Sequence, residues 1–146
     1  MTANRDYLES QVMTATPHQL HLMVVDGAIR FAVAAEAALA ENDVRKARSA
    51  LGKAREFVTE LIGGLDDKRQ PEVIKTVRSL FIFVNRCLVR ADLRGDAAQV
   101  RDAIQILRLH RETWIAVGEV LRAERAAKEP ATVDIDEPTS SFSWSR

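Results

Sequence analysis

Four stretches of the sequence carry apolar residues at three- and four-residue steps, the spacing that gathers them on one face of an α-helix. They cover about residues 16–41, 43–63, 71–94 and 96–127, and short polar connections separate them. Long helices joined by short connections pack beside neighbours that run in the opposite direction. The sequence therefore predicts an all-α fold, an antiparallel up-down four-helix bundle over residues 16–128.

Residues that favour helix ends mark the boundaries of these stretches. Thr16 is a predicted N-cap, Pro17 suits the first turn, and Gln19 can close a capping box with Thr16. The other boundaries carry polar caps and glycines: Asn42 or Asp43 before the second helix, Gly63-Gly64 after it, Gly95 after the third and Asp96 before the fourth. We expect Gly63-Gly64 to end its helix because glycine adopts the left-handed conformation at little cost.

The first predicted helix carries more apolar residues than one buried face needs. A helix in a four-helix bundle needs about three apolar positions in seven. Either the surplus merely widens the core, or the N-terminal segment, another subunit or a bound partner covers it. The surplus consists of a second apolar face on the first helix (Leu22, Val25, Ile29, Ala32 and Val33), the run 80–84 in the third, and Ile106, Leu109, Ile115 and Val120 in the fourth.

Gly27 stands inside the first apolar stretch, directly after Asp26. Asp-Gly is a pair typical of turns, and glycine within a helix costs about 1 kcal/mol relative to alanine. The apolar spacing nevertheless continues through this pair. We interpret Gly27 as a position where the missing side chain lets the backbone of a neighbouring helix or of a bound partner approach closely.

The two ends of the chain differ from the predicted bundle. Residues 1–15 can form a short helix that uses Tyr7, Leu8 and Val12. Residues 129–146 are rich in proline, serine and threonine and contain four acidic residues against one arginine, so we expect a disordered acidic tail.

Two aromatic residues in this tail, Phe142 and Trp144, are unusual for a disordered segment. One hypothesis is that they dock in an empty groove of the same or of a neighbouring molecule.

The charge balance and the lengths of the apolar stretches exclude two classes of partner. The whole chain has a formal net charge of zero, and because the tail carries about three net negative charges, the remainder is only mildly basic. A nucleic-acid-binding domain would show a much stronger basic patch. The chain has no signal-peptide core near its first residues and no uncharged stretch of the roughly 18–20 residues that span a bilayer. We expect a cytoplasmic protein with no nucleic-acid partner and no membrane insertion.

The residues that could carry chemistry form no catalytic or metal-binding motif. Cys87 is the single cysteine, so neither an intrachain disulfide nor a cysteine metal cluster can form. His18, His21 and His110 lack the Glu-x-x-His spacing of di-iron bundles, and Asp26 is the one acid within the first apolar run. The sequence therefore predicts a protein without enzymatic activity, metal site or cofactor.

The stretch TATPHQLHLMVVDGAIRF, residues 14–31, resembles the signature of the flagellar secretion chaperone family, FliS. That family typically reads Thr-Ala-Ser-Pro, two residues, Leu and, a few positions on, Met-Leu-Tyr-x-Gly-Ala-Ile-x-Phe. The segments FVTELIGGLD, LFIFVNRCLVRADLRGD and LRLHRETW extend the similarity, which covers about residues 4–122. The resemblance implies a cytoplasmic chaperone that binds the C-terminal region of flagellin, prevents its premature polymerisation and delivers it to the flagellar export gate.

The resemblance also implies how such a chaperone holds its client. In the family, apolar grooves of an antiparallel helical bundle receive flagellin helices, and the chaperone's own N-terminal segment partly covers the empty site. By this resemblance, Tyr7, Leu8 and Val12 would cover the groove. The expected partner-binding residues are Leu22, Val25, Gly27, Ile29 and Val33 of the first helix with Ile82 and Phe83 of the third.

Several positions depart from the family pattern. Val25 stands where the family has a tyrosine, Phe81 and Phe83 replace a tyrosine pair, and Asp92 replaces an asparagine. Losing the tyrosine hydroxyls removes hydrogen bonds but keeps apolar area, so we expect a groove with different polar detail. The alternative is a non-catalytic helical homo-oligomer, such as a homodimer, that buries its surplus apolar faces between subunits and has a structural or regulatory role.

Overall fold

The computed structural model describes residues 15–66, 68 and 70–128 of the chain. Within these residues the structure contains four helices and no strand: α2 (Pro17–Ala40), α3 (Val44–Gly63), α4 (Pro71–Arg94) and α5 (Ala97–Lys128). The predicted all-α class is confirmed. The predicted tail and residues 1–14 of the predicted N-terminal segment, including Tyr7, Leu8 and Val12, lie outside the described residues.

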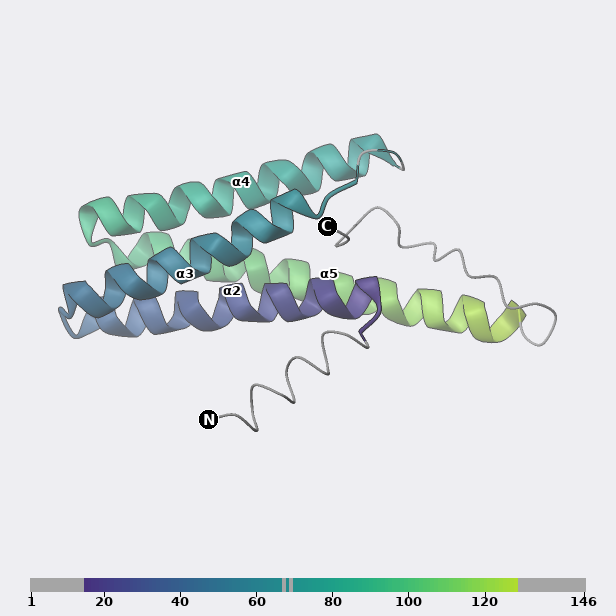
Figure 1. Cartoon of the computed structure of the whole chain (residues 1–146), viewed down its shortest axis with the longest axis horizontal. Coiled ribbons are helices and arrows are strands. Elements are labelled where there is room, and N and C mark those ends of the chain that lie inside the picture. The colour runs from purple at the N-terminus through teal and green to yellow at the C-terminus, as the bar shows by residue number, and fades with distance from the viewer. Residues whose placement is uncertain (1–14, 67, 69, 129–146) are drawn as a thin grey trace.

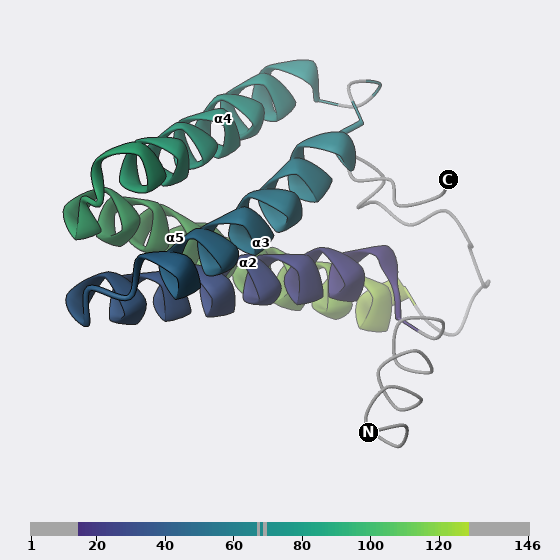
Figure 2. The same cartoon turned by 60° about the vertical axis from the view of Figure 1, so that its left-hand side comes forward.

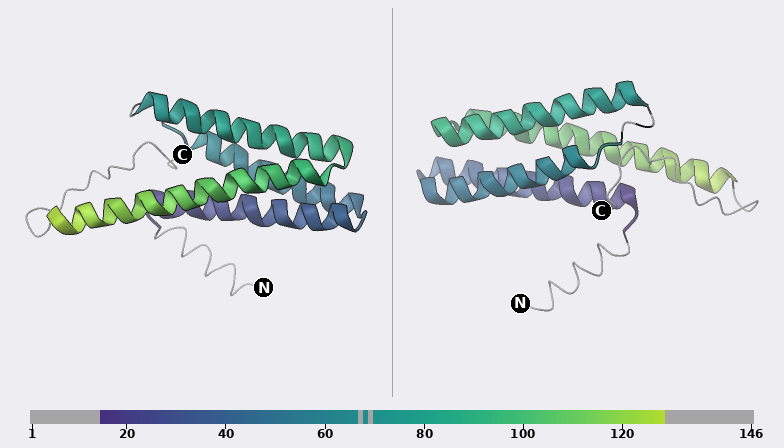
Figure 3. Two further views of the ribbon diagram at one scale, coloured as in Figure 1. Left: turned by 180° about the vertical axis from the view of Figure 1, so that it is seen from behind. Right: turned by 45° about the horizontal axis from the view of Figure 1, so that its top comes forward.

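The four helices pack as a ring in which each helix packs mainly against two others. α2 packs against α3 and α5, and α4 packs against the same two helices, so α2 and α4 are diagonal to each other. Successive helices run in opposite directions (Figure 1), and the turned view keeps α4 and α2 on opposite sides of α3 (Figure 2). The C-terminal part of α5 continues past the first residues of α2 (Figures 1 and 3).

The helix starts follow the capping chemistry expected from the sequence. Thr16 Oγ1 accepts from the backbone N–H of Gln19 at 3.1 Å, and the Gln19 side chain accepts from the Thr16 N–H at 3.0 Å, which completes the capping box. Asp43 caps α3 by accepting from the Lys46 N–H at 3.1 Å. Asp96 accepts from the N–H of Ala98 at 2.9 Å and so caps the start of α5.

One of the two predicted glycine stops works by a different mechanism. Gly95 follows α4 with a φ of +63°, the left-handed conformation that glycine tolerates. α3 does end at Gly63, but the next residue, Gly64, has a φ of −83° and remains right-handed. The left-handed explanation for Gly63-Gly64 was therefore wrong. Gln70, directly before α4, takes a positive φ of 47° instead.

The core combines small residues from α2 with large residues from the other helices. The buried face of α2 contains Ala28, Ala32, Ala35 and Ala38. Alanines keep the interhelical distance short and let the larger side chains of the neighbouring helices reach the centre. Each large apolar side chain buried there contributes roughly 1.5–3 kcal/mol. The largest apolar members of the core are Leu51, Leu61, Phe81, Leu88 and Leu107.

Candidate functional site

The second apolar face predicted on α2 is only partly accessible. Val25 is fully buried and belongs to the core, which corrects the expectation that it contacts a partner. The physical reason is helical geometry: Val25 shares its face with Ala28 and Ala32, which are also fully buried. Ile29 is half-buried against the core and Val33 is 39% exposed.

Gly27 accommodates an aromatic ring from the neighbouring helix. A Cβ atom added at Gly27 would lie 2.7 Å from Cε1 of Phe57, so the ring occupies the space that a side chain would need. The Phe57 ring also stacks on Phe31 of α2, with ring centroids 5.7 Å apart. The expectation that a backbone approaches Gly27 was therefore wrong, because the approaching group is a side chain of α3. Gly27 is buried and offers no surface to a partner.

A second glycine, Gly118 of α5, accommodates a ring in the same way. A Cβ atom at Gly118 would overlap the imidazole of His18. His18 stacks on Trp114, donates from Nε2 to the Trp114 carbonyl at 2.7 Å, and accepts on its own carbonyl from Trp114 Nε1 at 3.1 Å. These reciprocal bonds join the first turn of α2 to α5, so His18 has a structural role.

Two further histidines, the buried His21 and the partly buried His110, form a pair next to this contact. His21 is fully buried, and its Nε2 lies 2.7 Å from Nε2 of His110, so one ring donates to the other. Burial, followed by the proximity of His110 and His18, lowers the pKa of His21 to about 2. Burial likewise lowers the pKa of His110 to about 4. Both rings are therefore neutral at physiological pH and pack with Phe81 and Trp114.

Ion pairs cross the exposed edge between α2 and α5. Arg111 Nε donates to Asp26 Oδ1 at 2.5 Å, and Arg101 approaches Glu36 at 3.5 Å. Asp26, the one acid in the first apolar run, therefore has a bridging position between helices. Rings and ion pairs together close the α2–α5 seam along much of its length.

The large exposed apolar side chains are concentrated on α4 and α5. Nine of the eleven in the described residues belong to α4 and α5, whereas α2 and α3 contribute only Val33 and Val44. This distribution makes α4 and α5 the strongest candidates for binding a partner. The α4 and α5 residues are Val73, Leu80, Ile82, Phe83, Val89, Leu93, Leu109, Val117 and Val120.

The side of α4 that faces away from the core carries a mixed apolar and basic surface. Three- and four-residue steps place its members together, opposite the buried residues Phe81, Val84 and Leu88. Ile82 and Phe83 are each 42% exposed, and Leu93 is 77% exposed. We call this surface the α4 outer face and define it as Ile82, Phe83, Arg86, Val89, Arg90 and Leu93.

The basic residues of α4 are largely uncompensated. The one acid in its second half, Asp92, contacts Arg48 at 3.3 Å and Arg55 at 4.0 Å on α3. Among the described residues, Lys75, Arg86 and Arg90 form no ion pair. The surface is therefore suited to an apolar partner that also carries negative charge. The sequence contained a signal for it, because arginines alternate with apolar residues at helical steps from 82 to 93.

The predicted site residues do not form one continuous site. Ile82 and Phe83 lie on α4, whereas Leu22, Ile29 and Val33 lie on the diagonal helix α2. Sequence periodicity could show that each helix had a second apolar face, but it could not show which faces share a side of the molecule.

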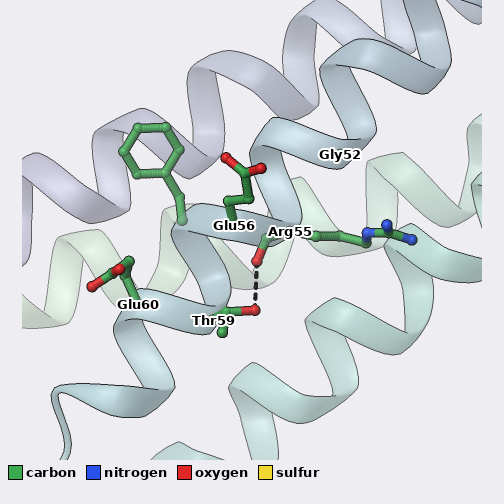
Figure 4. Close-up of a pocket in the computed structure, with 6 residues that line it drawn as sticks. Gly52, Arg55, Glu56, Thr59 and Glu60 are labelled. Carbon is green, nitrogen blue, oxygen red and sulfur yellow. Dashed lines mark hydrogen bonds between the residues drawn. The ribbon is translucent and has the colours of Figure 1, made fainter.

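A hollow on the outer side of α3 has a different character. It has a volume of about 590 Å³ and is lined by Gly52, Arg55, Glu56, Phe57, Thr59 and Glu60. Figure 4 shows Arg55 extending away from Glu56 and Glu60, with Thr59 Oγ1 donating to the Arg55 carbonyl at 2.8 Å. Three of the six lining residues are charged, so the hollow suits an apolar helix less well than the α4 outer face does.

The described part of the chain contains no group of three side chains arranged to hold a metal ion. None of the helices in that part is long and apolar enough to cross a membrane. Four packed helices with an apolar and basic surface that no other described helix covers are typical of a helical binding protein.

Comparison with known proteins gives the family. The family model described as flagellar protein FliS matches residues 1–120, and the chain belongs to this family. A flagellar secretion chaperone FliS from Salmonella typhimurium is 35% identical over 108 residues, which are 73% of this chain and 80% of the relative. Those from Escherichia coli and Bacillus subtilis are 28% and 27% identical, covering 73% and 74% of this chain and 79% and 80% of their own. FliS chaperones are non-catalytic.

Proposed function

We propose that this flagellar secretion chaperone binds the C-terminal segment of flagellin in the cytoplasm, prevents its premature polymerisation and aids its delivery to the flagellar export gate. Family membership supports the client class. The observation that carries the binding mode is the α4 outer face, where Ile82 and Phe83 are exposed beside Arg86. An amphipathic helix of the client would bury its apolar side against these residues.

Other contacts extend this proposal. Leu22, Ile29 and Val33 of α2 form a second, smaller contact, while Val25 and Gly27 act inside the core. The N-terminal residues Tyr7, Leu8 and Val12 cover this α2 part of the groove in the empty chaperone.

Folding of the client is coupled to its binding. A disordered segment gains helix as its apolar side becomes buried, and the ordering cost moderates the affinity. The chaperone therefore needs no catalytic group, only an exposed surface of matching shape and charge.

Calorimetric titration with the C-terminal segment of flagellin from the same organism tests the proposal. We expect 1:1 binding with a negative heat-capacity change and a gain of helix by circular dichroism. Ile82→Asp should weaken binding by about tenfold or more, because it places a charge in the buried centre of the interface. Val44→Asp is the matched control, since Val44 is an exposed valine on α3 and the same charge there should leave the affinity unchanged.

Two results would contradict the proposal. The first is no binding at micromolar concentrations, or equal weakening by Val44→Asp. The second is a stable homodimer by analytical ultracentrifugation that Ile82→Asp dissociates, which would favour the homo-oligomer alternative.

A further inference from the structure

The α4 outer face is matched in charge and apolar character by another part of the same chain. We propose that residues 129–146, which follow α5, dock on the α4 outer face of the same molecule. The proposal concerns the isolated chaperone and does not depend on the identity of its client. Three observations carry it: the charges of the two segments, their apolar residues, and the position of the end of α5.

The charges of the two segments are complementary. Residues 129–146 contain Glu129, Asp134, Asp136 and Glu137 against the single Arg146. On α4, Lys75, Arg86 and Arg90 have no ion-pair partner among the described residues. A segment rich in acids lowers its electrostatic energy by lying along such a helix, and a group of several charges does so more effectively than one exposed pair.

The apolar residues of the two segments are also complementary. In 129–146, Val133 and Ile135 alternate with acids, and Phe142 and Trp144 follow in an otherwise polar stretch. An extended chain with such alternation presents its apolar residues on one side and its acids on the other. On α4, Ile82 offers exposed apolar surface of this kind. Arg86 and Arg90 can also stack on aromatic rings as cation–π partners.

The end of α5 lies where the tail can reach this surface. The ring contact between Phe81 and His110, with centroids 4.8 Å apart, fixes the register of the two antiparallel helices. From that contact, α5 extends about 27 Å further to Lys128, while Lys75 lies about 9 Å along α4 in the same direction. The tail therefore has to return about 18 Å to reach the level of Lys75 and about 29 Å to reach Ile82.

The order of residues along the tail fits the order along α4. At about 3.3 Å per extended residue, Asp134 is up to about 20 Å from Lys128, and Phe142 is up to about 46 Å from it. The acids therefore reach the level of Lys75, and the aromatic residues reach the apolar part of the α4 outer face with length to spare for crossing from α5 to α4. Acids precede aromatics in the tail, as Lys75 precedes Ile82 and Val89 on the helix.

A spin label on the tail of the full-length chain tests this placement. We would replace Ser143 with cysteine in a Cys87→Ser background, attach a nitroxide, and record amide signals of the ¹⁵N-enriched protein. The amides of Ile82, Arg86 and Val89 should lose most of their intensity, while those at the start of α3 keep theirs. At 1 M salt, where the Debye length is about 3 Å, the loss should diminish. No loss on α4, or a larger loss elsewhere, would overturn the proposal.

Charge variants provide the matched control. Arg86→Glu with Arg90→Glu should restore the α4 signals, as should Asp134→Asn with Asp136→Asn in the tail. Arg45→Glu with Arg108→Glu makes the same change in charge at exposed arginines on α3 and α5 and should restore nothing. Restoration by this control pair would show only a general charge effect and overturn the specific site.

A mixing experiment separates docking within one chain from docking between copies. Spin-labelled chain without ¹⁵N is added to enriched chain without a label. Signal loss on α4 in this mixture would overturn docking within the same molecule, whereas an unchanged spectrum is the expected result.

Discussion

The apolar faces of α2 and α4 follow the same sequence pattern, but they lie in different environments in the folded protein. Both helices carry more apolar residues than one core-facing stripe requires. On α2, most of the surplus lies in the core or against the neighbouring helices, with Val25 fully buried. On α4, Ile82, Phe83 and Leu93 remain exposed on the side opposite the core.

The difference arises from what the neighbouring helices supply. α3 supplies Phe57, which fills the space beside Gly27, and α5 supplies Arg111 for Asp26. The outer face of α4 has no such neighbour among the described helices, because α3 and α5 both pack on its inner side. Surplus apolar surface therefore indicates a binding site only where no other helix covers it.

The same substitution on the two helices should have very different consequences. Val25→Asp places a carboxylate in the core and should cost about 4 kcal/mol or more of unfolding free energy, because nothing there can solvate the charge. Ile82→Asp should change stability by less than about 1 kcal/mol, since Ile82 is 42% exposed. Urea denaturation followed by circular dichroism measures both. Equal costs would show that the two faces are equally buried.

Acidification should destabilise the contact between α2 and α5 that contains His21 and His110. The folded-state pKa of His21 is lowered to about 2, so the unfolded chain binds its proton first, and stability falls as pH drops through the unfolded value of 6.5. Between pH 7.5 and 5 the loss from His21 alone is about 2 kcal/mol, and His110 adds to it in the same direction.

Denaturation at the two pH values, in the native chain and in His21→Asn, provides the measurement. The variant should show a smaller drop, because its residue 21 no longer titrates. A drop of the same size in both proteins would mean that the buried histidine pair does not carry the pH dependence.

The Phe57 ring beside Gly27 should determine whether Gly27→Ala stabilises or destabilises the protein. Gly27→Ala must displace the Phe57 ring, and we expect a net loss of about 1 kcal/mol after the gain in helix propensity. In a Phe57→Ala background the same change should instead stabilise the protein, by up to about 1 kcal/mol. A double-mutant cycle by chemical denaturation tests this, and an unchanged sign would contradict the assigned contact.

The ion pair between Asp26 and Arg111 should have the smallest effect. Their side chains are 47% and 42% exposed, so solvent screens the attraction. Asp26→Asn should cost less than about 1 kcal/mol, and the cost should shrink at high salt. Thermal melts at two salt concentrations measure it, with Asp43→Asn, which alters a helix cap instead of a cross-helix pair, as the comparison.

The sequence predicted local features well because their causes are local. The capping box of Thr16 and Gln19 and the left-handed Gly95 depend on a few neighbouring residues. The apolar periodicity also predicted one buried face for each helix, and Leu51, Phe81 and Leu107 are among the buried residues.

The assignment of α2 failed for a reason of geometry. Its two apolar stripes differ only by a rotation about the helix axis, and the small residues Ala28 and Ala32 face the centre together with Val25. The position of Phe57 over Gly27 depends on residues 30 positions apart, which no spacing rule encodes. Placing α2 and α4 diagonally likewise requires the packing of all four helices.

The alanine face of α2 has a consequence for how this protein tolerates substitution. Ala28, Ala32 and Ala35 lose no side-chain rotamer entropy on burial, so the helix is fixed in place at little entropic cost. The same tight fit leaves no volume for a larger residue, however apolar it is. Size is therefore the selective criterion on this face, whereas polarity and charge are the selective criteria on the α4 outer face. The α4 outer face can consequently change its chemistry while the alanine face of α2 keeps its shape.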